Sequence, residues 1–148
     1  MAAALRLPAP AKLNLMLHIT GRRADGYHLL QSVFQFIDLC DWLEFELRAD
    51  GRIHRHDGNS PIAAADDMLV RAASLLQSRC GVASGVDLRI DKRIPIGGGL
   101  GGGSSDAASC LLALNRLWEL GLTLEQLAEI GLELGADVPV FVHGRAAW

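Results

Sequence analysis

The residues best suited to chemistry are six glycines gathered around one leucine in the second half of the chain. The segment lies between a predicted strand and a predicted helix and consists of Pro95, Ile96, Gly97, Gly98, Gly99, Leu100, Gly101, Gly102, Gly103, Ser104 and Ser105. Glycines leave backbone N–H groups uncovered, and the N-terminal end of the helix adds partial positive charge. We expect the N–H groups of Ser104, Ser105 and Asp106 to point at a polyphosphate. The serine hydroxyls could cap the helix, donate to a phosphate or coordinate a phosphate-bound magnesium ion.

Two common nucleotide-binding patterns fit this segment poorly. A Walker A loop requires lysine where this chain has Gly103. Gly97, Gly99 and Gly102 match the dinucleotide pattern G-x-G-x-x-G, but glycine-rich sequence produces it by chance, and residues 121–125, some twenty positions on, are a helix junction instead of an acidic strand end. A plain connecting loop is also disfavoured, because so many glycines are costly to order.

The spacing of apolar residues predicts the elements that position this loop. Alternation predicts strands over 11–19, 28–39, 42–47 and 86–90, the first three as an antiparallel meander, and the apolar run 138–142 is interpreted as a further strand. Helical spacing predicts helices over 67–80, from the loop to before Gly121, and over 123–135. Gly81 is expected to end the first of these helices, and Thr123 with Gln126 is expected to form a capping box at the start of the last. Residues 51–61 are expected to form an exposed loop or hairpin, with His54 and His56 facing solvent. Because strands and helices are segregated, the pattern favours an α+β fold.

Composition narrows the classes of partner and location. The 148 residues fit one domain, the net charge is −3, and the 14 Lys and Arg residues are scattered, which argues against nucleic acid or a membrane surface as partner. The chain has three cysteines, an odd number, and they lie far apart at Cys40, Cys80 and Cys110. They are interpreted as buried thiols of a protein in a reducing, cytoplasmic compartment. The abrupt end at Trp148 leads us to expect a C-terminal continuation that packs against this chain.

Several motifs resemble a known family of small-molecule kinases. Residues 95–105 resemble the phosphate loop of the superfamily of galactokinase, homoserine kinase, mevalonate kinase and phosphomevalonate kinase (GHMP kinases). The segments 10–15 (PAKLNL), 23–31 (RADGYHLLQ) and 134–141 (LGADVPVF) resemble, within it, the 4-diphosphocytidyl-2-C-methyl-D-erythritol kinases of non-mevalonate isoprenoid synthesis. The resemblance implies an N-terminal ATP-binding domain over residues 1–148, with a largely antiparallel sheet packed with helices. It also implies that a C-terminal half present in the family is absent from this chain.

The reaction implied by the resemblance is phosphoryl transfer from ATP, with Mg²⁺, to the 2-hydroxyl of the cytidyl methylerythritol. Asp137 matches the family's catalytic base, and Lys12 matches the lysine that pairs with it and stabilises the transferring charge. Without the resemblance, the sequence favours a local turn role for Asp137 and a solvated position for Lys12 on the polar face of a strand.

Other site residues also follow from the resemblance. Tyr27 and His28 match positions at the cytosine, with Asn14 and Phe34 nearby, although a hairpin exit explains Tyr27 and His28 about equally well and Phe34 fits a core position better.

Lys92 and Asp67 match positions that line the adenine pocket. An aspartate at a helix N-cap needs no ligand to explain it. Asp106 is expected to repel phosphate unless it pairs with magnesium or another cation.

Two rival functions stay open from sequence. A sister kinase for homoserine or a mevalonate would share the phosphate loop but would not need Tyr27 and His28. The second rival function is that of a non-catalytic binding module, because the kinase domain of this family resembles a ribosomal-protein fold that binds RNA. The acidic net charge weighs against RNA binding.

Overall fold

The computed structural model describes residues 4–14, 34–56, 58–96 and 101–146. In chain order the elements are β1 (Ala4–Asn14), β2 (Phe34–Arg48), β3 (Ile53–Arg55), the 3₁₀ helix η1 (Ala64–Asp66), α1 (Met68–Cys80), β4 (Gly85–Asp91), α2 (Gly102–Leu117), α3 (Leu124–Leu132) and α4 (Val138–Ala146). The described part is α+β, as the sequence predicts. No helix within it is long and apolar enough to cross a membrane.

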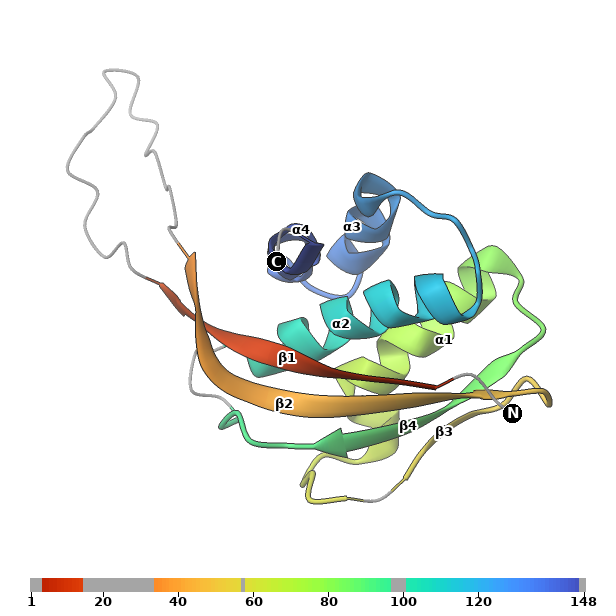
Figure 1. Ribbon diagram of the computed structural model, residues 1–148, viewed down its shortest axis with the longest axis horizontal. Coiled ribbons are helices and arrows are strands. Elements are labelled where there is room, and N and C mark those ends of the chain that lie inside the picture. The colour runs from red at the N-terminus through yellow and green to blue at the C-terminus, as the bar shows by residue number, and fades with distance from the viewer. Residues whose placement is uncertain (1–3, 15–33, 57, 97–100, 147–148) are drawn as a thin grey trace.

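The described strands form one sheet in the order β1-β2-β4-β3 (Figure 1). β1 pairs antiparallel with β2 and β2 antiparallel with β4, whereas β3 runs parallel to β4. The sheet is therefore largely antiparallel, but the predicted meander is wrong in two respects. Residues 34–48 form a single strand instead of two, and the segment interpreted as a loop or hairpin contributes the short parallel edge strand β3. A three-residue strand is too short to show a period of its own.

Alternation along the strands separates a helix-covered face from an open one. Leu43 and Phe45 of β2 and Val86 and Leu88 of β4 are buried, while Glu44 and other alternate residues are half-buried or exposed. Figure 1 shows α1 and α2 on the buried side, with α3 and α4 packed beyond α2. We call the open side the outer face of the sheet.

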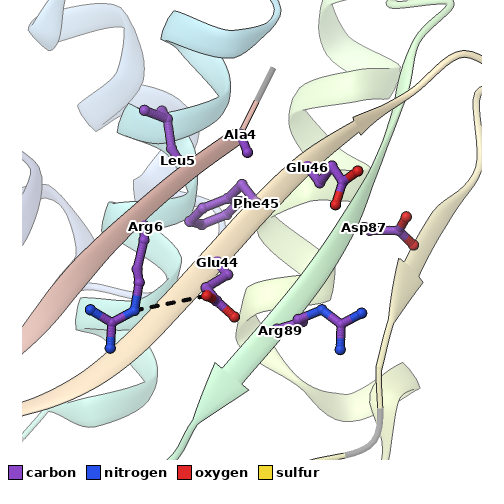
Figure 2. Close-up of a pocket in the computed structure, with 8 residues that line it drawn as sticks. All are labelled: Ala4, Leu5, Arg6, Glu44, Phe45, Glu46, Asp87 and Arg89. Carbon is purple, nitrogen blue, oxygen red and sulfur yellow. Dashed lines mark ion pairs between the residues drawn. The ribbon is translucent and has the colours of Figure 1, made fainter. Parts of the chain in front are cut away.

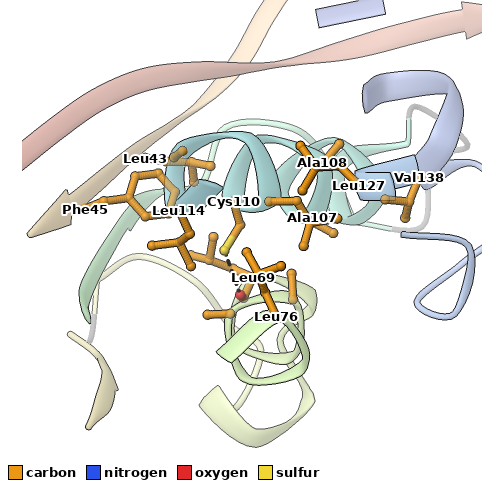
Figure 3. Close-up of a cluster of buried hydrophobic side chains, with 14 of the residues drawn as sticks. Leu43, Phe45, Leu69, Leu76, Ala107, Ala108, Cys110, Leu114, Leu127 and Val138 are labelled. Carbon is orange, nitrogen blue, oxygen red and sulfur yellow. Dashed lines mark hydrogen bonds between the residues drawn. The ribbon is translucent and has the colours of Figure 1, made fainter. Parts of the chain in front are cut away.

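The core lies between α1, α2 and the sheet (Figure 3). Leu69 and Leu76 of α1 pack against α2, on which small residues such as Ala107 and Cys110 allow close approach. The Cys110 thiol donates to the Leu69 carbonyl at 3.5 Å, and burial raises the pKa of that thiol well above its usual value. Cys110 is thus buried as expected, whereas Cys40 and Cys80 are only half-buried.

Local signals at the helix ends are confirmed. Asp67 caps α1 by accepting from the Leu69 N–H at 2.9 Å, and Gly81 ends it in the left-handed conformation. Thr123 and Gln126 form the predicted capping box at the start of α3. That helix ends at Leu132, three residues before Gly135.

The predicted strand over 138–142 is wrong, because these residues begin α4. Val138, Phe141 and Val142 are fully buried, which is helical spacing, and Pro139 is tolerated in a first turn where its missing N–H is not needed. A short apolar run fits a buried strand or a buried helix equally well, and valine-rich composition favoured the strand. His143, interpreted as a strand residue, is exposed on this helix.

Candidate active site

The glycine-rich segment leads into α2 through Gly101, which caps the helix with φ of 72°. The Ser105 N–H already donates to the Gly101 carbonyl at 2.8 Å, so the expectation that Ser105 and Asp106 offer free N–H groups is wrong. The helix starts two residues earlier than predicted. Its N–H groups without an acceptor inside the helix are those of Gly101, Gly102, Gly103 and Ser104. Residues 97–100 lie outside the described part of the chain.

A pocket of about 390 Å³ opens beside this helix end. Its lining combines the start of α1, the end of β4, the segment before the loop, the start of α2 and the turn before α4. The predicted site residues in this lining are Pro95, Ile96, Gly101, Gly102, Gly103, Ser104, Lys92 and Asp67. The apolar part of the pocket wall consists of Met68, Ile90 and Leu134. The N-terminal end of α2 provides hydrogen-bond donors. This combination suits a flat base joined to phosphates.

Lys12 and Asp137 meet at the same helix end although 125 positions separate them. Lys12 Nζ lies 3.8 Å from Asp137 Oδ2, and the side chains are 5% and 49% exposed. Lys12 is therefore not the solvated lysine that alternation predicts. A register shift in β1 between Pro10 and Lys12 interrupts the alternation and directs Lys12 inward.

Phe141 explains how α4 brings Asp137 to Lys12. Its ring contacts Phe36 of β2, with centroids 5.5 Å apart, and a Cβ built on Gly101 would lie 2.9 Å from Phe141 Cζ and 3.0 Å from Lys12 Cε. The carbonyl of Asp137 accepts from the Val140 N–H at 3.1 Å, so Asp137 stands at the start of α4. The loop, the lysine and the aspartate thus share one packed junction.

Below this junction Lys92 lies between two buried carboxylates. Its ammonium is 2.7 Å from Asp41 Oδ2 and 3.1 Å from Asp106 Oδ2. Asp41 also accepts from the Arg93 and Ile94 N–H groups at 2.7 and 2.8 Å. These contacts tie β2, the end of β4 and α2 together. The expected cationic partner of Asp106 is therefore Lys92, and the lysine matched to the adenine pocket borders it with its ammonium already paired.

The electrostatic environment of Asp106 favours its protonated form. Burial raises the pKa of Asp106 well above its ordinary value and the neighbouring Asp41 raises it further, while Lys92 acts in the opposite direction. Burial lowers the pKa of Lys92, but attraction to Asp106 and Asp41 outweighs it and the pKa is raised. Asp41 instead accepts three hydrogen bonds, from Lys92 and from the Arg93 and Ile94 N–H groups.

We expect the same substitution at these two carboxylates to have unequal effects. Asp41→Asn places an amide N–H beside the Lys92 ammonium and should lower the free energy of unfolding by about 2–4 kcal/mol. Asp106→Asn resembles the protonated acid and should cost no more than about 1 kcal/mol. Urea denaturation of both variants measures the difference; equal losses would contradict the assignment of the proton.

The pH dependence gives a second readout of Asp106. Above its ordinary pKa of 3.8 the unfolded chain has lost this proton while the folded chain keeps it, so the stabilisation it provides decreases as pH rises toward the raised folded value. Asp106→Asn should therefore make stability less dependent on pH over that range. An unchanged slope would indicate that Asp106 is ionised in the fold.

Asp67 is a helix cap that also forms a buried ion pair. Its Oδ2 lies 2.6 Å from Arg55 Nη1, and the two side chains are 5% and 4% exposed. The N-cap interpretation is confirmed, and the pair fixes β3 to the start of α1 at the wall of the pocket. A contact of Asp67 with adenine stays a prediction.

The acceptor residues are only partly described. Tyr27 and His28 lie outside the described residues. Asn14 and Phe34 are paired across β1 and β2, two residues beyond the pairing of Lys12 with Phe36. The ends of β1 and β2 at Asn14 and Phe34 therefore lie near Lys12.

Sequence reasoning missed Asp41, Arg55 and Phe141 as supports of the site. Asp41 fell between two predicted strands, 28–39 and 42–47. No local signal identifies its partners, which lie more than fifty positions away. Phe141 lies within the apolar run 138–142, which was interpreted as a strand instead of a helix.

A second hollow, of about 300 Å³, lies on the outer face of the sheet (Figure 2). Its charged lining consists of Arg6, Arg89, Glu44, Glu46 and Asp87, and Arg6 pairs with Glu44 at 3.8 Å. It has neither a helix N-terminus nor the Lys12 and Asp137 pair, so the chemistry of phosphate transfer fits the pocket at α2.

The domain defined by this loop, pocket and sheet has a family counterpart. The family model described as the GHMP kinases N terminal domain matches residues 67–145, more than half of the chain. The chain belongs to the GHMP kinase family, as its phosphate loop indicates.

Two similar curated proteins carry the same name. The chain is 64% identical over 141 residues to the 4-diphosphocytidyl-2-C-methyl-D-erythritol kinase of Nitrosococcus oceani, covering 95% of the chain and 50% of that protein. It is 60% identical over 144 residues to the protein of that name from Methylococcus capsulatus, covering 97% and 50%. The chain spans about half the length of the curated relatives it matches.

Solved structures agree with the fold. A crystal structure of 4-(cytidine 5'-diphospho)-2C-methyl-D-erythritol kinase matches with a TM-score of 0.76 and 41% identity, over 95% of the chain and 49% of that structure. A homoserine kinase from Cytophaga hutchinsonii matches with a TM-score of 0.68 at 17% identity, over 88% of the chain and 40% of that structure, and shows the fold alone.

Proposed function

We propose that the chain is the ATP-binding part of a kinase that phosphorylates the 2-hydroxyl of 4-diphosphocytidyl-2-C-methyl-D-erythritol. The approach of Lys12 to Asp137 at the N-terminal end of α2 carries this proposal, because it joins an anion site to a base and a cation. The names of the similar proteins support the choice of substrate. A cytoplasmic location stays a prediction from the cysteines.

In this proposal the phosphates of ATP bind at the start of α2. The N–H groups of Gly101, Gly102, Gly103 and Ser104 would hold phosphate oxygens, and the adenine would occupy the apolar part of the pocket near Met68. Asp137 would accept the proton of the acceptor hydroxyl, and Lys12 would stabilise charge on the transferring phosphoryl group. Phosphoryl transfer requires alignment and charge neutralisation above all, which these positions can supply.

The residues present also fit magnesium carried by ATP. Magnesium is held mainly by phosphate oxygens and one or two protein oxygens, and it neutralises charge between the phosphates. Ser104 lines the pocket, so its hydroxyl oxygen stands beside the proposed anion site. The Ser105 Oγ has no hydrogen-bond partner among the described residues, but Ser105 is fully buried and does not line the pocket. Asp106 is a poorer ligand, because it is paired with Lys92 and its raised pKa favours the protonated acid.

Phosphorus NMR of the chain with magnesium, ATP and the cytidyl methylerythritol tests the proposal in one spectrum. A new phosphomonoester signal would establish turnover. Shifted or broadened ATP signals without a monoester would support the nucleotide site and leave catalysis to a longer form of the protein. ATP signals that are unchanged at high protein concentration would contradict the phosphate site.

Replacing the acceptor substrate distinguishes the proposed kinase from a kinase that acts on homoserine or mevalonate. Homoserine or mevalonate offered in place of the cytidyl substrate should give no monoester signal. Phosphorylation of either one at a comparable rate would contradict the proposed specificity.

A further inference from the structure

Two histidines and an aspartate with metal-binding chemistry meet away from the nucleotide pocket. Arg55 of β3 points inward to Asp67, so its neighbours His54 and His56 point to the outer face. The parallel register places His54 opposite Asp87 of β4, and the His56 N–H donates to the Leu88 carbonyl at 2.8 Å, which extends the ladder. The expectation that both histidines simply face solvent is therefore incomplete.

The distances between these side chains match those between the ligands of one small ion. Asp87 Oδ1 lies 3.3 Å from His56 Nε2 and 3.6 Å from His54 Nδ1, and one ligand atom of each residue lies within 4.8 Å of the others. A tetrahedral zinc ion with ligands at about 2.0–2.1 Å places them about 3.3–3.4 Å apart. The distances from Asp87 Oδ1 to the two imidazole nitrogens are thus close to the spacing between zinc ligands.

The surroundings leave room for an ion and its remaining ligand. The three residues border a hollow of about 440 Å³ together with Arg48, Arg52 and Ile53. His56 and Asp87 are half-buried, and the His54 and His56 rings contact edge to face with centroids 4.6 Å apart, which limits their motion. Figure 2 shows Asp87 projecting from β4 on the outer face.

The Arg48 guanidinium competes with a metal ion for Asp87. Arg48 Nη1 lies 2.8 Å from Asp87 Oδ1, but the same guanidinium also makes bonds of 3.0 and 2.7 Å to Asp50. Arg48 therefore keeps a carboxylate partner if a metal ion takes Asp87. The competition predicts moderate affinity instead of the tight binding of a dedicated structural site.

We propose that His54, His56 and Asp87 form a binding site for a divalent transition-metal ion with zinc-like ligand preference, with water completing its coordination. Two imidazoles and a carboxylate are a zinc ligand set, whereas magnesium and calcium prefer oxygen ligands alone. A bound ion would fasten the edge strand β3 to β4. The inference does not depend on the proposed kinase function.

Isothermal titration of the purified, nucleotide-free chain with Zn²⁺, and visible absorption with Co²⁺, test the site. One ion per chain should bind, and His54→Gln or His56→Gln should each weaken binding roughly tenfold or more. His143→Gln, which removes an exposed histidine on α4, is the matched control and should leave the affinity unchanged.

Arg48→Gln gives an independent test in the opposite direction. Removing the competing guanidinium should tighten zinc binding, an effect that damage to the fold would not produce. Equal zinc affinity in the two site variants and the control, or weaker binding in Arg48→Gln, would overturn the proposal. Absence of Co²⁺ d–d bands in the chain would overturn it as well.

Discussion

Asp137→Asn is expected to lower the rate of phosphoryl transfer by about 10²–10⁴-fold, which is the usual contribution of a positioned general base. The amide keeps the shape of the side chain but cannot accept the hydroxyl proton, and it loses its charge interaction with Lys12. Binding of ATP should change by no more than about twofold, because the proposed phosphate contacts come from the start of α2. Single-turnover kinetics and ATP titration, in the form of the protein that shows turnover, separate the two effects.

Glu129→Gln is the matched control for Asp137→Asn. It also replaces a carboxylate with an amide, but at an exposed position on α3. We expect an unchanged rate. If Asp137→Asn retained full turnover, or if it weakened ATP binding as much as it slowed transfer, Asp137 could not be the base.

Gly101→Ala is expected to weaken ATP binding about a hundredfold. A Cβ at this position would lie about 3 Å from both Phe141 Cζ and Lys12 Cε, so the junction must shift and the N–H groups that follow no longer converge. The left-handed backbone adds strain, because φ is 72°. Fluorescence or calorimetric titration with magnesium and ATP measures the loss.

Gly121→Ala separates backbone strain from the contact at the site. Gly121 has φ of 67°, and an added Cβ would meet nothing within 4 Å. Both alanine variants should lose about 1–2 kcal/mol of stability from the left-handed conformation, but only Gly101→Ala should lose ATP affinity. Similar affinities in the two variants would place the phosphates elsewhere.

Local sequence patterns predicted the elements with strong periodicity and left the contacts between them undetermined. The helix cap at Asp67 and the capping box at Thr123 each depend on residues two or three positions apart, and both are confirmed. Asp41 fell between the strands predicted over 28–39 and 42–47. It lies inside β2, since Lys92 and two backbone N–H groups compensate its burial.

The candidate catalytic pair could not be assigned from the residues alone. Lys12 had the pattern of a surface lysine, and the register shift that turns it inward leaves no signature in the sequence. Asp137 looked like a turn residue before a strand and proves to start a helix. Family resemblance selected both residues, and their proximity follows from packing of α4 on β2 through Phe141 and Phe36.

The distance along the chain between Lys12 and Asp137 has a consequence for folding. Bringing together residues 125 positions apart costs about 4 kcal/mol of chain entropy, which the contacts of the assembled sheet and helices must offset. β1, β2 and the start of α2 all precede Asp137 in the chain, so a nascent chain can assemble the proposed phosphate site before the residue that would act as base has docked. The proposed phosphate contacts can thus form before the candidate base is in place, whereas phosphate transfer would also require α4 to dock.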